Sequence, residues 1–232
     1  HPAFELRRTV VGITMFGMGL FKKVVLADSI APFADVLFGQ AALGAPIDPA
    51  SAWIGSLCYA LQLYFDFSGY SDMAIGLGVI FGIKLPLNFD SPFKATNISD
   101  FWRRWHMTMT RFFTNYIYSG LAVKGMRNTM RLQLGQVGKY ALVAAVPAIV
   151  TFEIAGIWHG AGWNFMIYGL IHGLAIAAYL GWREFSSIRL PKVVAWALTM
   201  SLVVSALVMF RAPDVSTALT VLSNMWGFAW IG

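Results

Sequence analysis

The sequence predicts an all-α fold: a polytopic transmembrane helix bundle with an amphipathic interfacial helix. Composition is the first reason, because 58% of the 232 residues are hydrophobic and only 12% are charged. The mean hydropathy is +0.64. The second reason is the length of the apolar stretches, since about 20 apolar residues cross a hydrocarbon layer about 30 Å thick. Several stretches also lack the polar face at helical period that soluble helices show.

Apolar stretches follow one another along the whole chain, separated by turn-forming residues. They cover 9–27, 52–83, 140–158, 163–181, 192–211 and, in part, 215–232. Lys22 and Lys23 interrupt the first stretch, and FDFSGYSD forms a polar centre in the second. A Gly-Ala-Pro turn precedes the second stretch, and the proline-containing segment 84–94 follows it. We expect 1–232 to form a single membrane domain, and we expect the chain to be a fragment of a longer protein because it starts at a histidine.

Positive charge is concentrated in one region. Residues 84–139 hold nine of the 17 Lys and Arg residues but only two of the 11 Asp and Glu residues. By the positive-inside rule, this basic connecting region should face the cytoplasm. If 140–158 and 163–181 form a hairpin, Arg183, Arg189 and Lys192 fall on the same side. The topology before residue 84 stays open. Interleaving with apolar spans argues against a nucleic-acid partner.

The segment 99–118, SDFWRRWHMTMTRFFTNYIY, predicts a single amphipathic helix capped by Ser99. Aromatic residues, including Trp102 and Trp105, share one face at 100° per residue, and Arg103 and Arg104 lie on the opposite face. Such a helix lies in the membrane interface or packs across the mouth of a bundle. His106 falls near one edge of the apolar face. It is either an interfacial histidine with its polar edge in water or a functional residue.

The segment 152–173, FEIAGIWHGAGWNFMIYGLIHG, places His159 and His172 among apolar residues. Ionisable groups in membrane segments are costly and suggest function. In apolar surroundings an imidazole is expected in its neutral form, which can accept a proton. Gly160 and Gly162 predict a break that would project His159 from a helix end into a cavity. Alternatively, glycines four residues apart place both histidines on helix-packing faces, and His172 fits this structural role better.

Two carboxylates, Asp66 and Asp72, lie in the polar centre of the second stretch. They could line the same cavity, orient a histidine or cap a helix break at Ser68-Gly69. A capping or packing role is at least as consistent with their spacing, because residues six apart do not share a helix face. Glu153 is likewise badly placed to contact His159. Motifs for a serine nucleophile, a phosphate loop or a zinc protease are absent from the sequence, so a histidine general base is the simplest catalytic scheme.

Several blocks of the sequence resemble the membrane-bound O-acyltransferase family. The blocks are YFDFSGYSDMAIGLG, LPLNFDSPFKATNISDFWRRWHMTMTRFFTNYIY and GIWHGAGWNFMIYGLIHG, in that order along the chain. The resemblance is to the bacterial branch of alginate and polysaccharide O-acetylases, and GLFKKVVLADSIAPFADVLF at 19–38 also resembles that branch. It covers most of residues 9–181 and implies a partial membrane-bound O-acyltransferase fold. Members of that family are usually considerably longer.

The resemblance implies roles for particular residues. It makes His159 the catalytic histidine and His106 the second functional one. We expect further residues to line the substrate and donor passage, with no metal site: Asp66, Asp72, Trp102, Arg103, Arg104, Trp105, Trp158 and Asn164. The arginine face would hold an anionic donor or lipid headgroups.

The resemblance also implies the reaction and its setting. An acetyl group would pass from a cytoplasmic donor, ultimately acetyl-CoA, to hydroxyls of an envelope polysaccharide such as alginate. We expect no tightly bound cofactor. Expected partners are the lipid bilayer, the polysaccharide acceptor and extracytoplasmic acetyl-transfer proteins. The expected location is the bacterial inner membrane, crossed several times.

Three other functions remain open from the sequence. D-alanyl transfer to teichoic acid would use the same histidine but an acyl-loaded carrier protein as donor. A transporter or channel would also place histidine and aspartate inside a bundle. A purely structural membrane module would tolerate replacement of His159, His106, Asp66 and Asp72.

Overall fold

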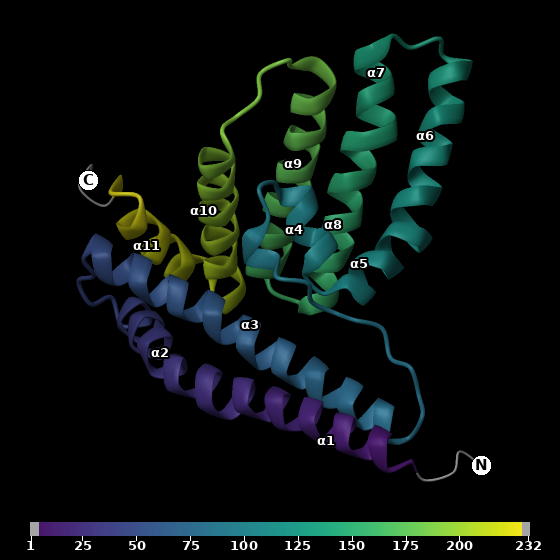
Figure 1. The fold of residues 1–232 in the computed structure, drawn as a ribbon. Coiled ribbons are helices and arrows are strands. Elements are labelled where there is room, and N and C mark those ends of the chain that lie inside the picture. Colours follow the sequence, from purple (N-terminus) through teal and green to yellow (C-terminus); the bar gives the residue numbers. More distant parts are fainter. Residues whose placement is uncertain (1–4, 229–232) are drawn as a thin grey trace. The chain divides into compact units, whose positions relative to one another are not determined.

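The computed structural model describes residues 5–228, and this part of the chain is helical without any strand. It divides into two compact units (Figure 1). Unit 1 comprises the chain up to Asp90 together with the segment from Ser216 onward, and unit 2 is Ser91–Val215. Each unit is described by itself. That the whole chain acts as one membrane domain stays a prediction.

Unit 1 is built on two long antiparallel helical runs. The first run is unbroken and consists of α1 (Leu6–Leu20), the π-helical η1 (Phe21–Ala27) and α2 (Asp28–Ala42). It turns back into α3 (Pro49–Ile80), whose N-terminus is capped by Asp48 accepting a hydrogen bond of 3.0 Å from the Ser51 amide. A Cβ atom on Gly19 would collide with the backbone of α3 around Gly69 and Met73, so glycine allows the two runs to approach closely.

Lysines and aspartates join these two runs of unit 1. Lys22 pairs with Asp72 at 2.6 Å, and Lys23 pairs with Asp66. Both lysines lie in the π-helical turn η1, within the apolar run that they interrupt in the sequence. Of the roles considered for these aspartates, capping a helix break at Ser68-Gly69 is excluded, because α3 continues through these residues and both carboxylates bind lysines.

The helix α11 (Val215–Met225), the last that the described residues contain in full, belongs to unit 1 apart from its first residue. The indole of Trp53 donates a hydrogen bond of 2.7 Å to the carbonyl oxygen of Met225. The predicted partial segment 215–232 is therefore helical up to Met225, and its last four residues lie outside the described part of the chain.

Unit 2 is a set of short helices packed around a hairpin of two long ones. Its elements, in chain order, are η2 (Pro92–Lys94), α4 (Ile98–Arg104), α5 (Met107–Phe113), the π-helical η3 (Thr114–Tyr118), α6 (Ser119–Arg131), α7 (Gln136–Tyr140), the π-helical η4 (Ala141–Ala145), α8 (Val146–His159), α9 (Trp163–Phe185) and α10 (Lys192–Arg211). The hairpin of α8 and α9 and the neighbouring pair α6 and α7 are visible in Figure 1.

Glycines allow α8 and α9 to pack backbone against backbone. A Cβ atom on Gly156 would lie 3.1 Å from the Cα of Gly169. One on Gly173 would lie 2.8 Å from the Cα of Ile149. The helix-packing glycines predicted from the sequence are therefore confirmed at these three positions. Gly160 has a different role, since it follows the end of α8.

Several basic residues gather at one end of the hairpin. Gln136 donates a hydrogen bond of 3.1 Å to Glu184, which joins the start of α7 to the end of α9. Asn164, at the other end, donates hydrogen bonds to the carbonyls of Met209 and Ala212, so α10 runs antiparallel to α9. Lys139, Arg183 and Lys192 consequently lie at one end of unit 2, as the hairpin prediction required. We call this the basic end.

Four helical runs are long and apolar enough to cross a membrane: Leu6–Ala42, Gln136–His159, Trp163–Phe185 and Lys192–Arg211. They contain the predicted segments 9–27, 140–158, 163–181 and 192–211. The second predicted segment forms α3, which is long but does not meet the same criterion of apolarity. Its polar centre explains the difference.

The single amphipathic helix predicted over 99–118 is wrong. Asn97 rather than Ser99 caps α4, accepting a hydrogen bond of 2.8 Å from the amide of Asp100. The helix ends at Arg104, and His106 adopts the left-handed conformation with φ of 43° before α5 begins. The aromatic and arginine pattern has helical period on both sides of this turn, which conceals the break. Residues 84–139 thus include η2, α4, α5, η3, α6 and most of α7 beyond the connection at 84–91, and their cytoplasmic placement stays a prediction.

We expect Gly169→Val to destabilise unit 2, because the added side chain would meet the backbone of Phe152 and Glu153 in α8. Overpacking of this kind typically costs about 1–3 kcal/mol. Thermal unfolding of the full-length protein in detergent measures the effect. Gly120→Val is the matched control, since a Cβ atom on this glycine in α6 meets nothing within 4 Å. Equal melting temperatures for the two variants would contradict the close packing of α8 and α9.

Candidate active site

The predicted break after His159 is present in the structure. The helix α8 ends at His159, and α9 begins at Trp163 after three residues that include two glycines. Gly160 is extended, and a Cβ atom there would lie 2.5 Å from the ring of Phe165. Glycine is therefore required by close approach of an aromatic ring, and the short turn leaves His159 at the tip of the hairpin. This tip is the end of unit 2 opposite the basic end.

Aromatic rings surround the imidazole of His159. Ring centroids lie 4.8 Å away for Trp158, 5.0 Å for Phe210 and 6.3 Å for Tyr168. Trp158 is 60% exposed and His159 is half-buried, so the site is not sealed among hydrocarbon side chains. Within the described residues, His159 makes ring contacts but no side-chain hydrogen bond. Its ring nitrogens are therefore available to a hydroxyl group.

The second predicted histidine lies close to the first. His106 occupies the left-handed turn between α4 and α5, and its ring centroid is 6.5 Å from that of Trp158. Burial, and secondarily the nearby charge of His159, lowers the pKa of His106 to about 4. His106 is consequently uncharged at neutral pH and able to donate one hydrogen bond. The turn that breaks the predicted amphipathic helix is thus what brings His106 toward Trp158.

The third histidine, His172, is buried among packed side chains. His172 is 1% exposed, and its Nδ1 accepts a hydrogen bond of 3.2 Å from the indole of Trp102. Its Nε2 is buried without a partner among the described residues. Tyr168 lies on α9, like His172, and its ring is 4.6 Å from that of His172. The same ring contacts His159, so Tyr168 lies between the two histidines. The interpretation of His172 as a packing residue fits this burial.

The remaining residues predicted to line a passage have varied surroundings. Trp102 and Trp105 are buried, and the ring of Trp105 stacks on that of Phe101 at 5.6 Å. Asn164 is buried and binds the end of α10 through the two hydrogen bonds given above. Trp158 is the member of this set that contacts both His159 and His106.

The predicted arginine face is partly neutralised by its own helix. Arg103 and Arg104 bind the two carboxylate oxygens of Asp100 at 3.1 Å and 3.0 Å. The side chain of Arg103 is still 71% exposed, whereas that of Arg104 is 32% exposed. Asp66 and Asp72 belong to unit 1, where they pair with lysines.

Sequence reasoning did not identify two residues beside His159. Tyr168 precedes His172 by four residues on α9, so helical spacing could have placed them together. Phe210 lies near the end of α10, far from the histidine in sequence, and its position gives no local signal. A cavity of about 680 Å³ lies elsewhere, toward the basic end of unit 2.

Comparisons with known proteins agree with the motifs and with this fold. The model of the membrane-bound O-acyltransferase family matches residues 2–221. The chain is 45% identical to a peptidoglycan O-acetyltransferase of Helicobacter pylori over 225 residues, which is 95% of this chain and 40% of that protein. It is 37% identical to a probable alginate O-acetylase of Azotobacter vinelandii over 230 residues, 98% of this chain and 42% of that protein.

A third relative covers less of the chain. A teichoic acid D-alanyltransferase of Streptococcus thermophilus is 33% identical over 124 residues, 53% of this chain and 28% of that protein. The chain spans about 40% of the length of the O-acetylating relatives. Four candidate spans, a helical fold, the ordered motif blocks and a family match over nearly all residues lead to one conclusion. The chain belongs to the membrane-bound O-acyltransferase family.

Proposed function

We propose that this chain carries the catalytic histidine of a membrane-embedded O-acetyltransferase that acts on an envelope polysaccharide. His159 is the general base. The observation that carries the proposal is an imidazole without a hydrogen bond to the described residues, at a helix break, in a chain of an O-acyltransferase family.

The proposed reaction is direct acyl transfer. A ring nitrogen of His159 takes the proton of an acceptor hydroxyl while the hydroxyl oxygen attacks the acetyl carbonyl carbon. The bond from the carbonyl carbon to the donor sulfur breaks, and the thiolate leaves with the proton returned by the histidine. His106, uncharged at neutral pH, donates a hydrogen bond to the carbonyl oxygen or positions the donor.

The arrangement of unit 2 supports separate approaches for the two substrates. Lys139 and His159 are separated by 20 residues of helix, or about 30 Å at 1.5 Å per residue. If the basic end faces the cytoplasm, His159 lies toward the acceptor side of the membrane. The proposal therefore requires an acetyl thioester, supplied ultimately by cytoplasmic acetyl-CoA, to reach His159 across most of the bilayer thickness.

The acceptor is proposed from the relatives. Their names specify peptidoglycan and alginate, which both carry sugar hydroxyls in the cell envelope. We propose an envelope polysaccharide of this kind as the acceptor, with extracytoplasmic proteins completing the transfer. A multi-pass position in the bacterial inner membrane follows from the same proposal. D-alanyl transfer is less favoured, because the teichoic acid relative matches only about half of the chain.

We expect His159→Gln in the full-length protein to reduce polysaccharide acetylation about 10²- to 10⁴-fold, the usual contribution of general-base catalysis. Mass spectrometry of the polysaccharide from cells complemented with the variant measures the O-acetyl content. The half-buried position of His159 should leave folding intact, so membrane levels and melting temperature should match those of the unmodified protein. Acetylation at the unmodified level by a well-expressed variant would exclude His159 as the base.

His172→Gln provides the contrast. We expect it to lower the melting temperature, because the amide would replace a fully buried ring that accepts a hydrogen bond from Trp102 and packs on Tyr168. Per folded molecule, acetylation should fall much less than in His159→Gln. A folded His172 variant with the same catalytic defect as the His159 variant would instead assign His172 to the reaction.

The identity of the donor separates acetyl transfer from D-alanyl transfer. Membranes containing the full-length protein and its partner proteins should transfer label from [¹⁴C]acetyl-CoA to the polysaccharide. A D-alanyl-loaded carrier protein should not support transfer under the same conditions. Label from the carrier protein but not from acetyl-CoA would contradict the proposed substrate while leaving the role of His159 in place.

A further inference from the structure

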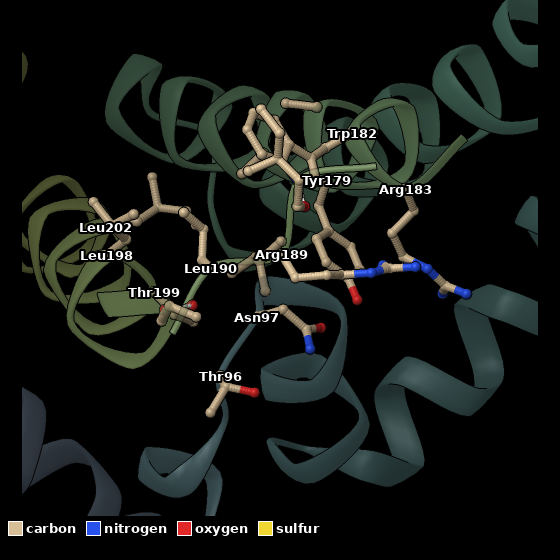
Figure 2. A pocket seen from close by; sticks show the side chains of 15 residues that line it. Thr96, Asn97, Tyr179, Trp182, Arg183, Arg189, Leu190, Leu198, Thr199 and Leu202 are labelled. Carbon is tan, nitrogen blue, oxygen red and sulfur yellow. Dashed lines mark hydrogen bonds between the residues drawn. The ribbon is translucent and has the colours of Figure 1, made fainter. Parts of the chain in front are cut away.

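A cavity with no role in the proposed reaction lies in unit 2, near the basic end (Figure 2). It has a volume of about 680 Å³, is open on one side, and is bordered by one face of α9, one face of α10, the segment between them and the start of α4. On α9 the lining residues include Ala175, Ala178 and Trp182, and on α10 they include Leu198 and Leu202. These positions recur at helical spacing, and Ala175–Trp182 on α9 and Ala195–Leu202 on α10 each form a largely apolar wall about 10 Å long.

Two arginines lie at one side of this apolar cavity. Arg183 comes from the last turn of α9, and Arg189 comes from the segment between α9 and α10. Figure 2 shows both side chains extending toward the same side of the pocket. The guanidinium carbon of Arg183 lies 6.0 Å from the centroid of the Tyr179 ring. Neither arginine pairs with a carboxylate in the described part of the chain, so their charges are available to an anion.

The position of the cavity specifies the depth at which a ligand would bind. Both α9 and α10 are candidate membrane spans, and the arginines lie where α9 ends and α10 is about to begin. The indole of Trp182 donates a hydrogen bond of 3.1 Å to the carbonyl oxygen of Ile188, which ties the intervening segment to α9. Tryptophan, tyrosine and arginine at the ends of spans are typical of the headgroup level of a bilayer.

We propose that this cavity binds an anionic phospholipid. Arg183 and Arg189 bind its phosphate by charge-assisted hydrogen bonds, and an acyl chain occupies the apolar walls formed by α9 and α10. Basic pockets between transmembrane helices are known sites for anionic headgroups. The two unpaired arginines match the negative phosphate of such a lipid. The apolar groove beside them matches its acyl chain.

The same geometry separates this site from the histidines. From Trp163, next to the hairpin tip, to Arg183 is 20 residues of α9, or about 30 Å. A molecule bound by Arg183 and Arg189 is therefore remote from His159. The ligand is a bound lipid and not the reacting acyl donor, and the site does not depend on the proposed reaction.

The test uses the full-length protein and measures lipid retention by native mass spectrometry. The protein is released from detergent in the presence of phosphatidylglycerol or of neutral phosphatidylcholine. We expect bound phosphatidylglycerol on the unmodified protein and roughly 30-fold weaker retention on the double variant Arg183→Gln/Arg189→Gln, as expected from the loss of two surface cations. Phosphatidylcholine should bind weakly to both.

The matched control is Lys124→Gln/Arg127→Gln, which removes the same charge from exposed positions of α6 outside the cavity. It should retain phosphatidylglycerol like the unmodified protein. Ala178→Trp keeps both arginines but fills the apolar part, and it should also lose the lipid. Because Ala178 is exposed, this variant should fold.

Several results would overturn the proposal. One is equal retention of phosphatidylglycerol by all four proteins. Another is the absence of bound phosphatidylglycerol on the unmodified protein, as would occur if another part of the full-length chain covered the cavity. A third is displacement of the lipid by acetyl-CoA together with loss of acetyl-CoA binding in the arginine variant, which would assign the site to the donor. Failure of acetylation alone would not affect this proposal, because the readout is lipid binding.

Discussion

The direct contact of backbones between α8 and α9 determines the rest of unit 2. Gly156, Gly169 and Gly173 remove the side chains that would hold the helices apart. Lipid supplies no hydrophobic force between two apolar helices, so their association depends on van der Waals contact and hydrogen bonds. With the helices held this closely, a three-residue turn is enough to connect them. His159 is thereby fixed at a hairpin tip rather than inside a continuous helix.

The residues around His159 at the hairpin tip come from several other elements of unit 2. The end of α10 brings Phe210 against His159, and Asn164 fastens that end by hydrogen bonds to two backbone carbonyls. The left-handed turn between α4 and α5 brings His106 to Trp158. Behind this cluster, Trp102 and Tyr168 surround the buried His172. A rigid aromatic support beneath a half-buried imidazole suits the role proposed for His159, because a general base must hold its orientation during proton transfer.

Charged side chains have different surroundings in different parts of the protein. The basic end carries Arg183 and Arg189 beside an apolar cavity, whereas aromatic rings, including the exposed Trp158, surround His159 at the tip. The ion pairs of unit 1 show another use of charge in an apolar setting. Lys22 and Lys23 are each matched by an aspartate of α3, which offsets the cost of removing both partners from water. Aspartates that suggested a substrate passage therefore have a sufficient structural explanation.

The sequence by itself determined the class of the protein, its main apolar segments, the break after His159 and the family. Each of these depends on local composition, glycine placement or ordered motifs, which need no knowledge of distant contacts. It did not determine the turn at His106, because the helical period of 99–118 continues on both sides of a single residue with positive φ. Only the tertiary structure decided that Asp66 and Asp72 bind lysines, that Phe210 contacts His159 and that Arg183 and Arg189 share one cavity. The first two contacts join residues far apart in the chain, and the cavity beside the two arginines exists only because α10 packs next to α9.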